Sequence, residues 1–293
     1  MNPLRNYAAI LLGIMSPLLL MSEARAEDAL AFVTEVNGKV SVIRADGKAE
    51  PASVGSQLFV GDQTKVTEGK AVLIYLSGRT VEIDAGKSHK VVKEQTGGGT
   101  RMERLIGTLD EMIGAQEETD RPVVHGMARN LPLTGASPLN TRISHTRFTF
   151  SWDGLEGADS YTFALETTDG KKLATKSLQD TTLSTETLGL EPGKTYVWSV
   201  VAEFIIPHST GKNQVEIASA EESTALQAAL KEVDEGYTGT TRSLLKAATC
   251  YKQGFLFEAQ NYVMEVKGKE DVASVNTMLQ SLQGKMQRKD PTK

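Results

Sequence analysis

The period of the apolar pattern changes once along this chain of 293 residues, and that change limits the fold more than any other feature. Up to about residue 217, apolar and polar residues alternate in short runs separated by glycine turns, which is typical of β-strands. Beyond it, apolar residues recur every three or four positions, which is typical of helices. The sequence therefore predicts a multi-domain protein that is mainly β and then α.

A first β module is predicted over 29–92. Within it Val72, Ile74 and Leu76 alternate with Leu73 and Tyr75, as in a strand. Turn signals interrupt the apolar runs at Asp46-Gly47, Gly61-Asp62 and Ser77-Gly78. This spacing predicts short strands of about four to six residues in a small barrel or sandwich.

Several positions of this module resemble the FecR domain. They are Gly38-Lys39-Val40, Asp46-Gly47, Leu58, Gly61-Asp62, Thr67, Ala71, Leu73, Ser77-Gly78-Arg79, Val81 and Ile83. In the iron-transport branch of that family, the resemblance implies a periplasmic domain that passes a receptor signal to a sigma factor. This chain departs from that branch at its start, where a signal peptide is predicted, so the resemblance implies an envelope interaction module instead.

The polar candidates for chemistry in this module are Asp62, Glu82, Asp84 and His89. Asp62 follows a glycine, a position where a carboxylate commonly accepts backbone N–H groups and closes a turn. His89 lies in a charged stretch with lysines on both sides, which favours a surface histidine over a metal ligand. We therefore predict no catalytic residue and no metal site here.

Residues 93–137 are predicted to form a linker with one short helix. Met102, Leu105, Ile106, Leu109 and Ile113 recur at helical spacing, and an isolated helix this short is only marginally stable. Its apolar face is therefore expected to pack within the chain, with contact to a partner as the alternative.

A second β module is predicted over 138–216. Phe148, Phe150 and Trp152 share one strand face. The module resembles a fibronectin type III domain, which implies a spacer or binding module. The matching positions are Trp152, Gly157-Ala158-x-x-Tyr161 and Leu190-x-Pro192-Gly193-x-x-Tyr196-x-Trp198-x-Val200-x-Ala202. Tyr196 is in place for a tyrosine corner. Both tryptophans are expected in the core, with a sugar-stacking platform as the alternative.

A helical tail is predicted over 218–287, beginning at the capping-box candidate Ser219-x-x-Glu222. Part of it is similar to one tetratricopeptide hairpin, but stable arrays need about three repeats, so a helical cap or adaptor is the prediction. Cys250 is the single cysteine. It is interpreted as a small apolar residue on a packed helix face, with a reactive thiol as the alternative. Apolar stripes mark four helices at 226–233, 244–251, 259–266 and 272–282.

The first 26 residues are interpreted as a signal peptide. Arg5 precedes an apolar run over 8–21, and Ala24-x-Ala26 supplies small residues before a cleavage site at Glu27. The apolar run is shorter than the roughly 20 residues that span a bilayer. The sequence therefore predicts an exported, periplasmic protein that is soluble once the peptide is removed.

Charge and motifs limit the function. The chain has 32 Lys and Arg against 37 Asp and Glu, a balance that argues against nucleic acid as a partner. The Gly-x-Ser-x-Gly and His-Glu-x-x-His motifs of hydrolases do not occur. We predict no enzyme activity and no cofactor. The expected function is that of a scaffold or signalling accessory that contacts other envelope or membrane proteins. The alternative is a module that binds peptidoglycan or another polysaccharide through exposed aromatic side chains.

Overall fold

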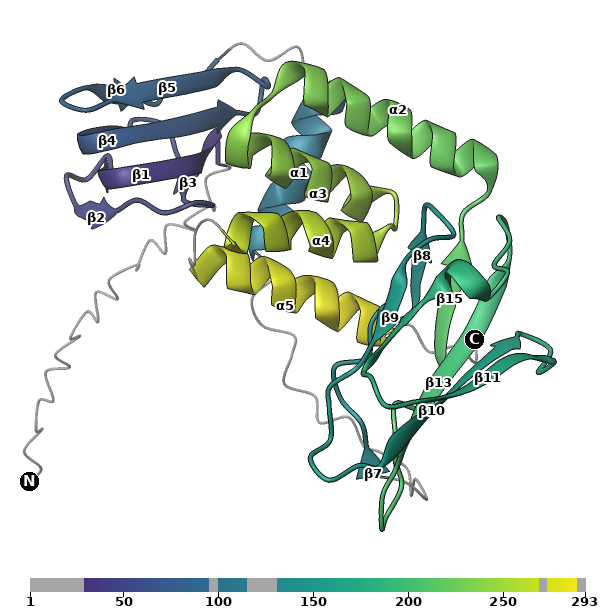
Figure 1. The fold of residues 1–293 in the computed structure, drawn as a ribbon. Helices are drawn as coiled ribbons and strands as arrows, with labels where there is room; N and C mark the ends of the chain where they lie inside the picture. The colour runs from purple at the N-terminus through teal and green to yellow at the C-terminus, as the bar shows by residue number, and fades with distance from the viewer. Residues whose placement is uncertain (1–28, 95–99, 115–130, 269–272, 289–293) are drawn as a thin grey trace, which may run out of the picture.

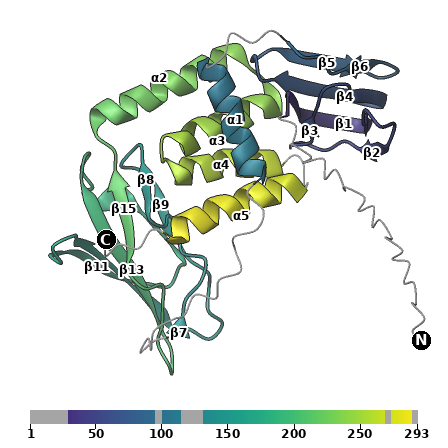
Figure 2. The same ribbon diagram turned by 180° about the vertical axis from the view of Figure 1, so that it is seen from behind.

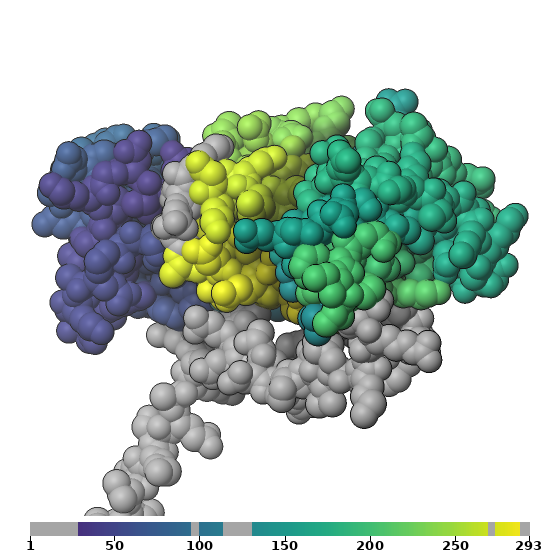
Figure 3. Space-filling view, turned by 60° about the horizontal axis from the view of Figure 1, so that its bottom comes forward, coloured from purple at the N-terminus to yellow at the C-terminus, as the bar shows by residue number. Residues whose placement is uncertain are grey.

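The computed structural model describes residues 29–94, 100–114, 131–268 and 273–288. The predicted signal peptide and its cleavage site lie outside these residues. A helical module lies in the middle of the molecule, with the first β module on one side and the second on the other (Figure 1). The three modules form one continuous body in the space-filling view (Figure 3).

The first β module is built around two long antiparallel strands, β1 (Ala31–Ile43) and β4 (Gln63–Tyr75). The turn predicted at Asp46-Gly47 closes the hairpin between β1 and β2, and Gly47 has a φ of 88°. The shorter strands flank the long pair: β2 (Ala49–Pro51) and β3 (Gln57–Leu58) pair with β1, while β5 (Thr80–Asp84) and β6 (Ser88–Lys90) pair with β4.

The prediction of uniformly short strands is wrong for β1 and β4, which have 13 residues each. Gly38 and Gly69, which interrupt the apolar pattern, lie opposite each other within the ladder instead of ending it. A Cβ atom on either glycine would lie 2.0–2.2 Å from a backbone oxygen of the other strand. Register shifts beside Val33 and Lys39 bend the pair of strands. Both strands therefore continue past the close approach of Gly38 and Gly69 and do not end there.

The helix predicted in the linker is present as α1 (Arg101–Gly114). Its apolar face packs against α3 and α5 within the chain, and Ile106 and Met112 are completely buried there. The tail forms the four predicted helices, although Val272 of the last stripe lies outside the described residues. They are α2 (Ala220–Gly236), α3 (Gly239–Lys252), α4 (Leu256–Lys267) and α5 (Ala273–Arg288).

The predicted capping box starts α2. The Ser219 hydroxyl accepts from the Glu222 backbone N–H at 3.2 Å, and the Glu222 carboxylate accepts from the Ser219 backbone N–H at 2.9 Å. Between α3 and α4, Gly254 has a φ of 82° and its N–H donates to the Tyr251 carbonyl. The chain therefore turns back sharply, so α3 and α4 form an antiparallel hairpin.

The second β module is a sandwich. One sheet has the order β11-β10-β13-β14-β7, with β15 pairing with both β13 and β8, and the other consists of β9 and β12. The strands are β7 (Leu131–Pro132), β8 (Thr141–Ile143), β9 (Thr149–Ser151), β10 (Ser160–Thr167), β11 (Lys172–Leu178), β12 (Thr182–Ser184), β13 (Thr195–Glu203), β14 (His208–Ser209) and β15 (Asn213–Ile217), with a 3-10 turn at Thr185–Thr187.

Aromatic side chains fill the space between these sheets. The ring centroids of Phe150 and Trp198 are 4.8 Å apart, and those of Phe150 and Phe163 are 5.1 Å apart. The Tyr196 hydroxyl accepts from the Glu191 backbone N–H at 2.9 Å, as the prediction of a tyrosine corner requires. The hydroxyl thereby ties the start of β13 to the loop before it.

The helical module shares a core with the first β module. Phe32, Val54 and Ile74 point out of that module into the cluster of buried residues built by α1 to α5. At the same boundary, the Thr34 and Thr241 hydroxyls are 2.6 Å apart and buried. Helices therefore cover one face of the β1–β4 pair.

The contact between the helical module and the sandwich is more polar than the contact between the helical module and the first β module. The Glu258 carboxylate accepts from the Ser144 backbone N–H at 2.6 Å, and the Leu256 N–H donates to the Thr141 hydroxyl at 3.1 Å. Arg142 pairs with Glu222 of α2 at 2.9 Å. No helix within the described ranges has the length and apolar character needed to cross a bilayer.

Candidate binding surfaces

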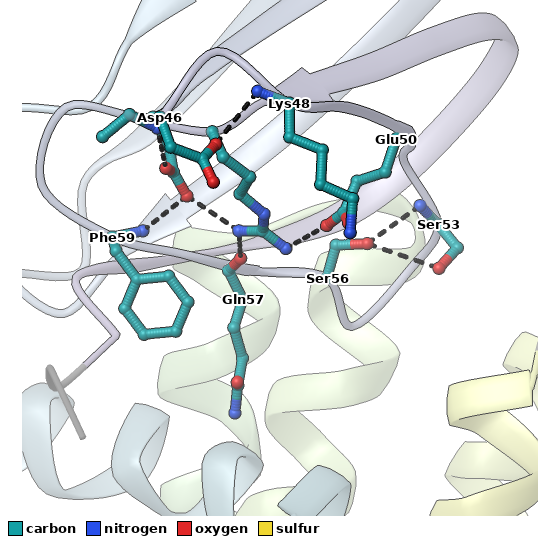
Figure 4. A network of polar contacts seen from close by, with 10 residues as sticks. Asp46, Lys48, Glu50, Ser53, Ser56, Gln57 and Phe59 are labelled. Carbon is teal, nitrogen blue, oxygen red and sulfur yellow. Dashed lines mark hydrogen bonds and ion pairs between the residues drawn. The ribbon is translucent and has the colours of Figure 1, made fainter. Parts of the chain in front are cut away.

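Asp62 belongs to a polar network in the first β module. Figure 4 labels Glu50, Gln57 and Phe59 of this network. The Asp62 carboxylate accepts from the Arg44 guanidinium at 2.7 Å and from the backbone N–H groups of Phe59 at 3.0 Å and Ala45 at 3.2 Å. The Asp62 side chain is 3% exposed, and Arg44 also pairs with Glu50. The carboxylate thus has donors on several sides and holds two loops together, the structural role predicted from Gly61-Asp62.

The other polar candidates of this module do not join Asp62. Asp84 pairs with Lys87 at 2.7 Å on the surface, and Glu82 lies near Lys70. His89 is half-buried and its Nε2 lies 2.8 Å from the Tyr75 hydroxyl, so it differs from the free surface side chain that was expected. Burial lowers the pKa of His89. The described residues contain no His, Cys, Asp and Glu group able to hold a metal ion.

Cys250 is completely buried in α3. Burial raises the pKa of its thiol well above the usual range, with a smaller contribution from the nearby Glu258 charge. A thiol reacts as the thiolate, so both effects suppress its reactivity. The position agrees with the interpretation of Cys250 as a packing residue.

The two tryptophans are likewise core residues. Trp198 is 1% exposed and its indole N–H donates to the Pro138 carbonyl at 3.1 Å. Trp152 is 4% exposed and packs on Tyr161. Neither ring face is open to a sugar, so the alternative of a stacking platform built on them is wrong.

Two Ser-x-x-Lys spacings, which the sequence analysis did not identify, also fail as nucleophile and base. Lys212 pairs with Glu166 at 2.7 Å, and Lys246 pairs with Asp234 at 2.6 Å. Ser243, the serine before Lys246, donates to the Glu265 carboxylate. Each lysine therefore pairs with a carboxylate, and Ser243 has a carboxylate partner of its own.

A hollow lies between α1, α2 and α3, and we call it the helix groove. Its volume is about 560 Å³, within the roughly 300–1,000 Å³ of ordinary ligand pockets. Figure 2 shows α1 crossing in front of α3, with α2 beyond it at the top of the molecule. The groove is lined by Arg101, Met102, Arg104, Leu105, Ala229, Glu232, Val233, Thr249, Lys252 and Gln253.

Side chains of two kinds line the helix groove. Met102, Leu105, Ala229 and Val233 make its apolar part. Exposed cations lie along it, and of these only Arg101 has an acidic partner, Glu232 at 2.6 Å. The remaining two, Arg104 and Lys252, form no ion pair within the described residues, so the groove has an excess of positive charge.

A second exposed feature lies in the sandwich, at the turn between β13 and β14. Phe204, Ile205 and Ile206 follow one another there and are 38%, 92% and 53% exposed; we call them the apolar tip. Sequence analysis missed both the groove and the tip. The tip had a signal, since Phe204-Ile205-Ile206-Pro207 breaks the alternation of β13. The groove had none, because it depends on how distant helices pack.

No protein-family model matches the chain, and no curated protein matches it. Among solved structures, a domain described as a cell surface anchoring domain is 20% identical, with 25% of this chain and 96% of that one covered and a TM-score of 0.23. A Fn3-like protein from Clostridium thermocellum is 18% identical, over 31% of this chain and 97% of that one, with a TM-score of 0.24.

The three fibronectin domains FN1–FN3 of chicken CNTN1 are 9% identical, over 66% of this chain and 64% of that one, with a TM-score of 0.24. Structures similar to this chain thus include fibronectin type III-like modules. At such TM-scores these likenesses add nothing to what the strand pairing defines, which is a β-sandwich joined to a helical module.

Proposed function

We propose that this protein is a non-catalytic interaction protein of the bacterial envelope that binds a protein partner in the helix groove. The observation that carries the proposal is the groove itself, an apolar groove beside which Arg104 and Lys252 form no ion pair with a described residue. Grooves between helices commonly bind peptide or helical segments through apolar anchors, while flanking charges choose the partner. An acidic partner segment with apolar residues matches this groove.

Placement in the periplasm is part of the proposal. It is supported by the signal-peptide pattern of residues 1–26, with cleavage before Glu27, and by the resemblance of residues 29–92 to the FecR domain. The resemblance of residues 138–216 to fibronectin type III domains supports a spacer that presents other surfaces. In this proposal, the protein is a scaffold or a signalling accessory that contacts other envelope or membrane proteins.

A pull-down tests the groove. The bait is the chain from Glu27 onward, as wild type and as the double variant Arg104→Glu/Lys252→Glu, which reverses the charge of these two groove cations. The control bait is Lys65→Glu/Lys90→Glu, which makes the same charge change on the first β module, where neither lysine forms an ion pair within the described residues.

We expect at least one envelope protein to bind wild type and control and to be lost from the groove variant. Direct titration of that protein should show binding at least about tenfold weaker to the groove variant. Equal capture by all three baits would contradict the proposal. Retention of wild type on purified cell-wall sacculi, in place of protein capture, would favour the polysaccharide alternative.

A further inference from the structure

The apolar tip is a built feature of the sandwich. The Phe204 ring lies over the loop before β10, where a Cβ atom on Gly157 would be 3.1 Å from the ring. Phe204 also contacts His208 edge-on, with centroids 6.2 Å apart. The turn is therefore held from both sides, and it presents Ile205, with 92% of its surface exposed, to the outside.

Acidic residues lie beside the tip, at the end of β13 and in the loop before β10. Glu203 precedes Phe204, and its carbonyl accepts from the Asp159 backbone N–H. Glu156 lies in the same loop as Gly157. All three carboxylates are exposed, and none forms an ion pair with a described residue. The tip thus has an apolar centre with exposed carboxylates beside it, on the side of β10.

The helix groove has the opposite character. Its apolar part can accept aliphatic side chains. Its cations Arg104 and Lys252, which form no ion pair with a described residue, can pair with carboxylates. The apolar side chains of the tip therefore match the apolar part of the groove. The carboxylates beside the tip and the cations beside the groove have opposite charge. This complementarity connects two surfaces of the same chain.

We propose that the apolar tip of one molecule binds in the helix groove of a second copy. Within one molecule the two features cannot meet, because the β13–β14 turn beside β7 and helix α2 lie at opposite ends of the structure (Figures 1 and 2). A contact between two different surfaces is heterologous, so it continues from copy to copy as a ring or filament. This inference rests on the proposed role of the groove and names its partner.

A lipid surface is the other environment that accepts exposed aliphatic residues. Glu156, Asp159 and Glu203 argue against it, because anionic headgroups attract basic surfaces and these carboxylates are negative. Membrane binding through the tip is therefore an outcome that the experiment must be able to show.

The experiment uses sedimentation of the chain from Glu27 onward and two variants that each remove one surface. Ile205→Ser/Ile206→Ser removes apolar surface from the tip, and Arg104→Glu/Lys252→Glu reverses the groove. Wild type should show a mass that rises with concentration past the dimer. Each variant alone should remain monomeric, with binding weakened roughly 10- to 100-fold, since the tip loses two buried aliphatic side chains.

Mixing the two variants gives the sharpest outcome. The intact tip of the groove variant can still enter the intact groove of the tip variant, so the mixture should form dimers and stop there. Two identical faces meeting in a symmetric dimer would not show this restoration. Circular dichroism of each variant confirms that the fold is retained, and Lys65→Glu/Lys90→Glu should assemble as wild type does.

A charge exchange provides a second check. Asp159→Lys/Glu203→Lys should abolish assembly on its own. Mixed with Arg104→Glu/Lys252→Glu, it should restore assembly past the dimer, because its basic tip can then enter the acidic groove as well. A wild type that stays monomeric at all concentrations, or assembly unaffected by either variant, would overturn the inference. So would binding to anionic lipid vesicles that depends on the tip alone. If wild type is monomeric and a different envelope protein still needs the groove, the inference falls and the proposed function stands.

Discussion

Asp62 shows how a single carboxylate supports the first β module. It accepts one charged and two backbone hydrogen bonds while being almost completely buried. Asp62→Ala leaves the Phe59 and Ala45 N–H groups without this acceptor and removes one of the two carboxylates that pair with Arg44. We expect the free energy of unfolding to fall by about 2–4 kcal/mol, measured by urea denaturation.

Asp46→Ala is the matched control for that measurement. Asp46 lies on the neighbouring turn and is exposed, and within the described residues its carboxylate accepts one hydrogen bond, from the Lys48 backbone N–H at 2.9 Å. Its replacement should cost less than about 1 kcal/mol. Similar losses for both variants would show that Asp62 has no special role.

Cys250 leads to a second prediction at the scale of one residue. Since the thiol is buried and its pKa is raised, a thiol reagent should label the native protein at least about a hundredfold more slowly than the urea-unfolded protein. The measurement is the rate of colour release from an aromatic disulfide reagent at neutral pH. Rapid labelling of the native chain would contradict the burial of Cys250.

Local patterns predicted most elements but not their lengths. The turn at Asp46-Gly47 and the helix α1 follow from short-range rules, because a turn or a helical stripe is encoded within a few residues. The 13-residue strands β1 and β4 do not follow from such rules. Gly38 and Gly69 are needed for the close approach of two strands, and that need appears only once the pairing is known.

The tyrosine corner gives a prediction at the scale of elements. Tyr196→Phe keeps the buried ring and removes the hydroxyl that accepts from the Glu191 N–H. The free energy of unfolding should fall by about 1–2 kcal/mol, because a partly buried N–H loses its partner. Tyr262→Phe is the control, since its hydroxyl makes no hydrogen bond with a described residue, and it should change stability by less than about 0.5 kcal/mol. Equal effects of the two variants would show that the Tyr196 hydroxyl gives no specific stabilisation.

For the whole molecule, the sequence predicted separate modules but not their shared core. On β4, Leu73 belongs to the core of the first β module, and its neighbour Ile74 belongs to the core of the helices. The alternation of Val72, Ile74 and Leu76 with Leu73 and Tyr75 did not show which element covers the second face of this strand. The uninterrupted apolar run Ala71 to Leu76 was the available signal, because strands buried on both faces read as continuous apolar runs.

Those two neighbours allow a test of how the modules are coupled. Leu73 and Ile74 are both completely buried and point to opposite faces of β4. Ile74→Ala should weaken the contact between the first β module and the helices. We expect the free energy of unfolding to fall by about 2–4 kcal/mol. In native-state hydrogen exchange, amides of α3 around Leu245 should then exchange faster, as should those of β1.

Leu73→Ala is the matched variant, because it removes a side chain of similar size from the other face. It should lower protection of β1 and β4 by a similar amount and affect α3 much less. The amides of β13 in the sandwich serve as an internal reference, since that core is separate from both residues. If the two variants accelerated amide exchange in α3 equally, the face of β4 that lost its side chain would make no difference to α3. The helices would then depend on the first β module as a whole and not on the apolar contact through Ile74.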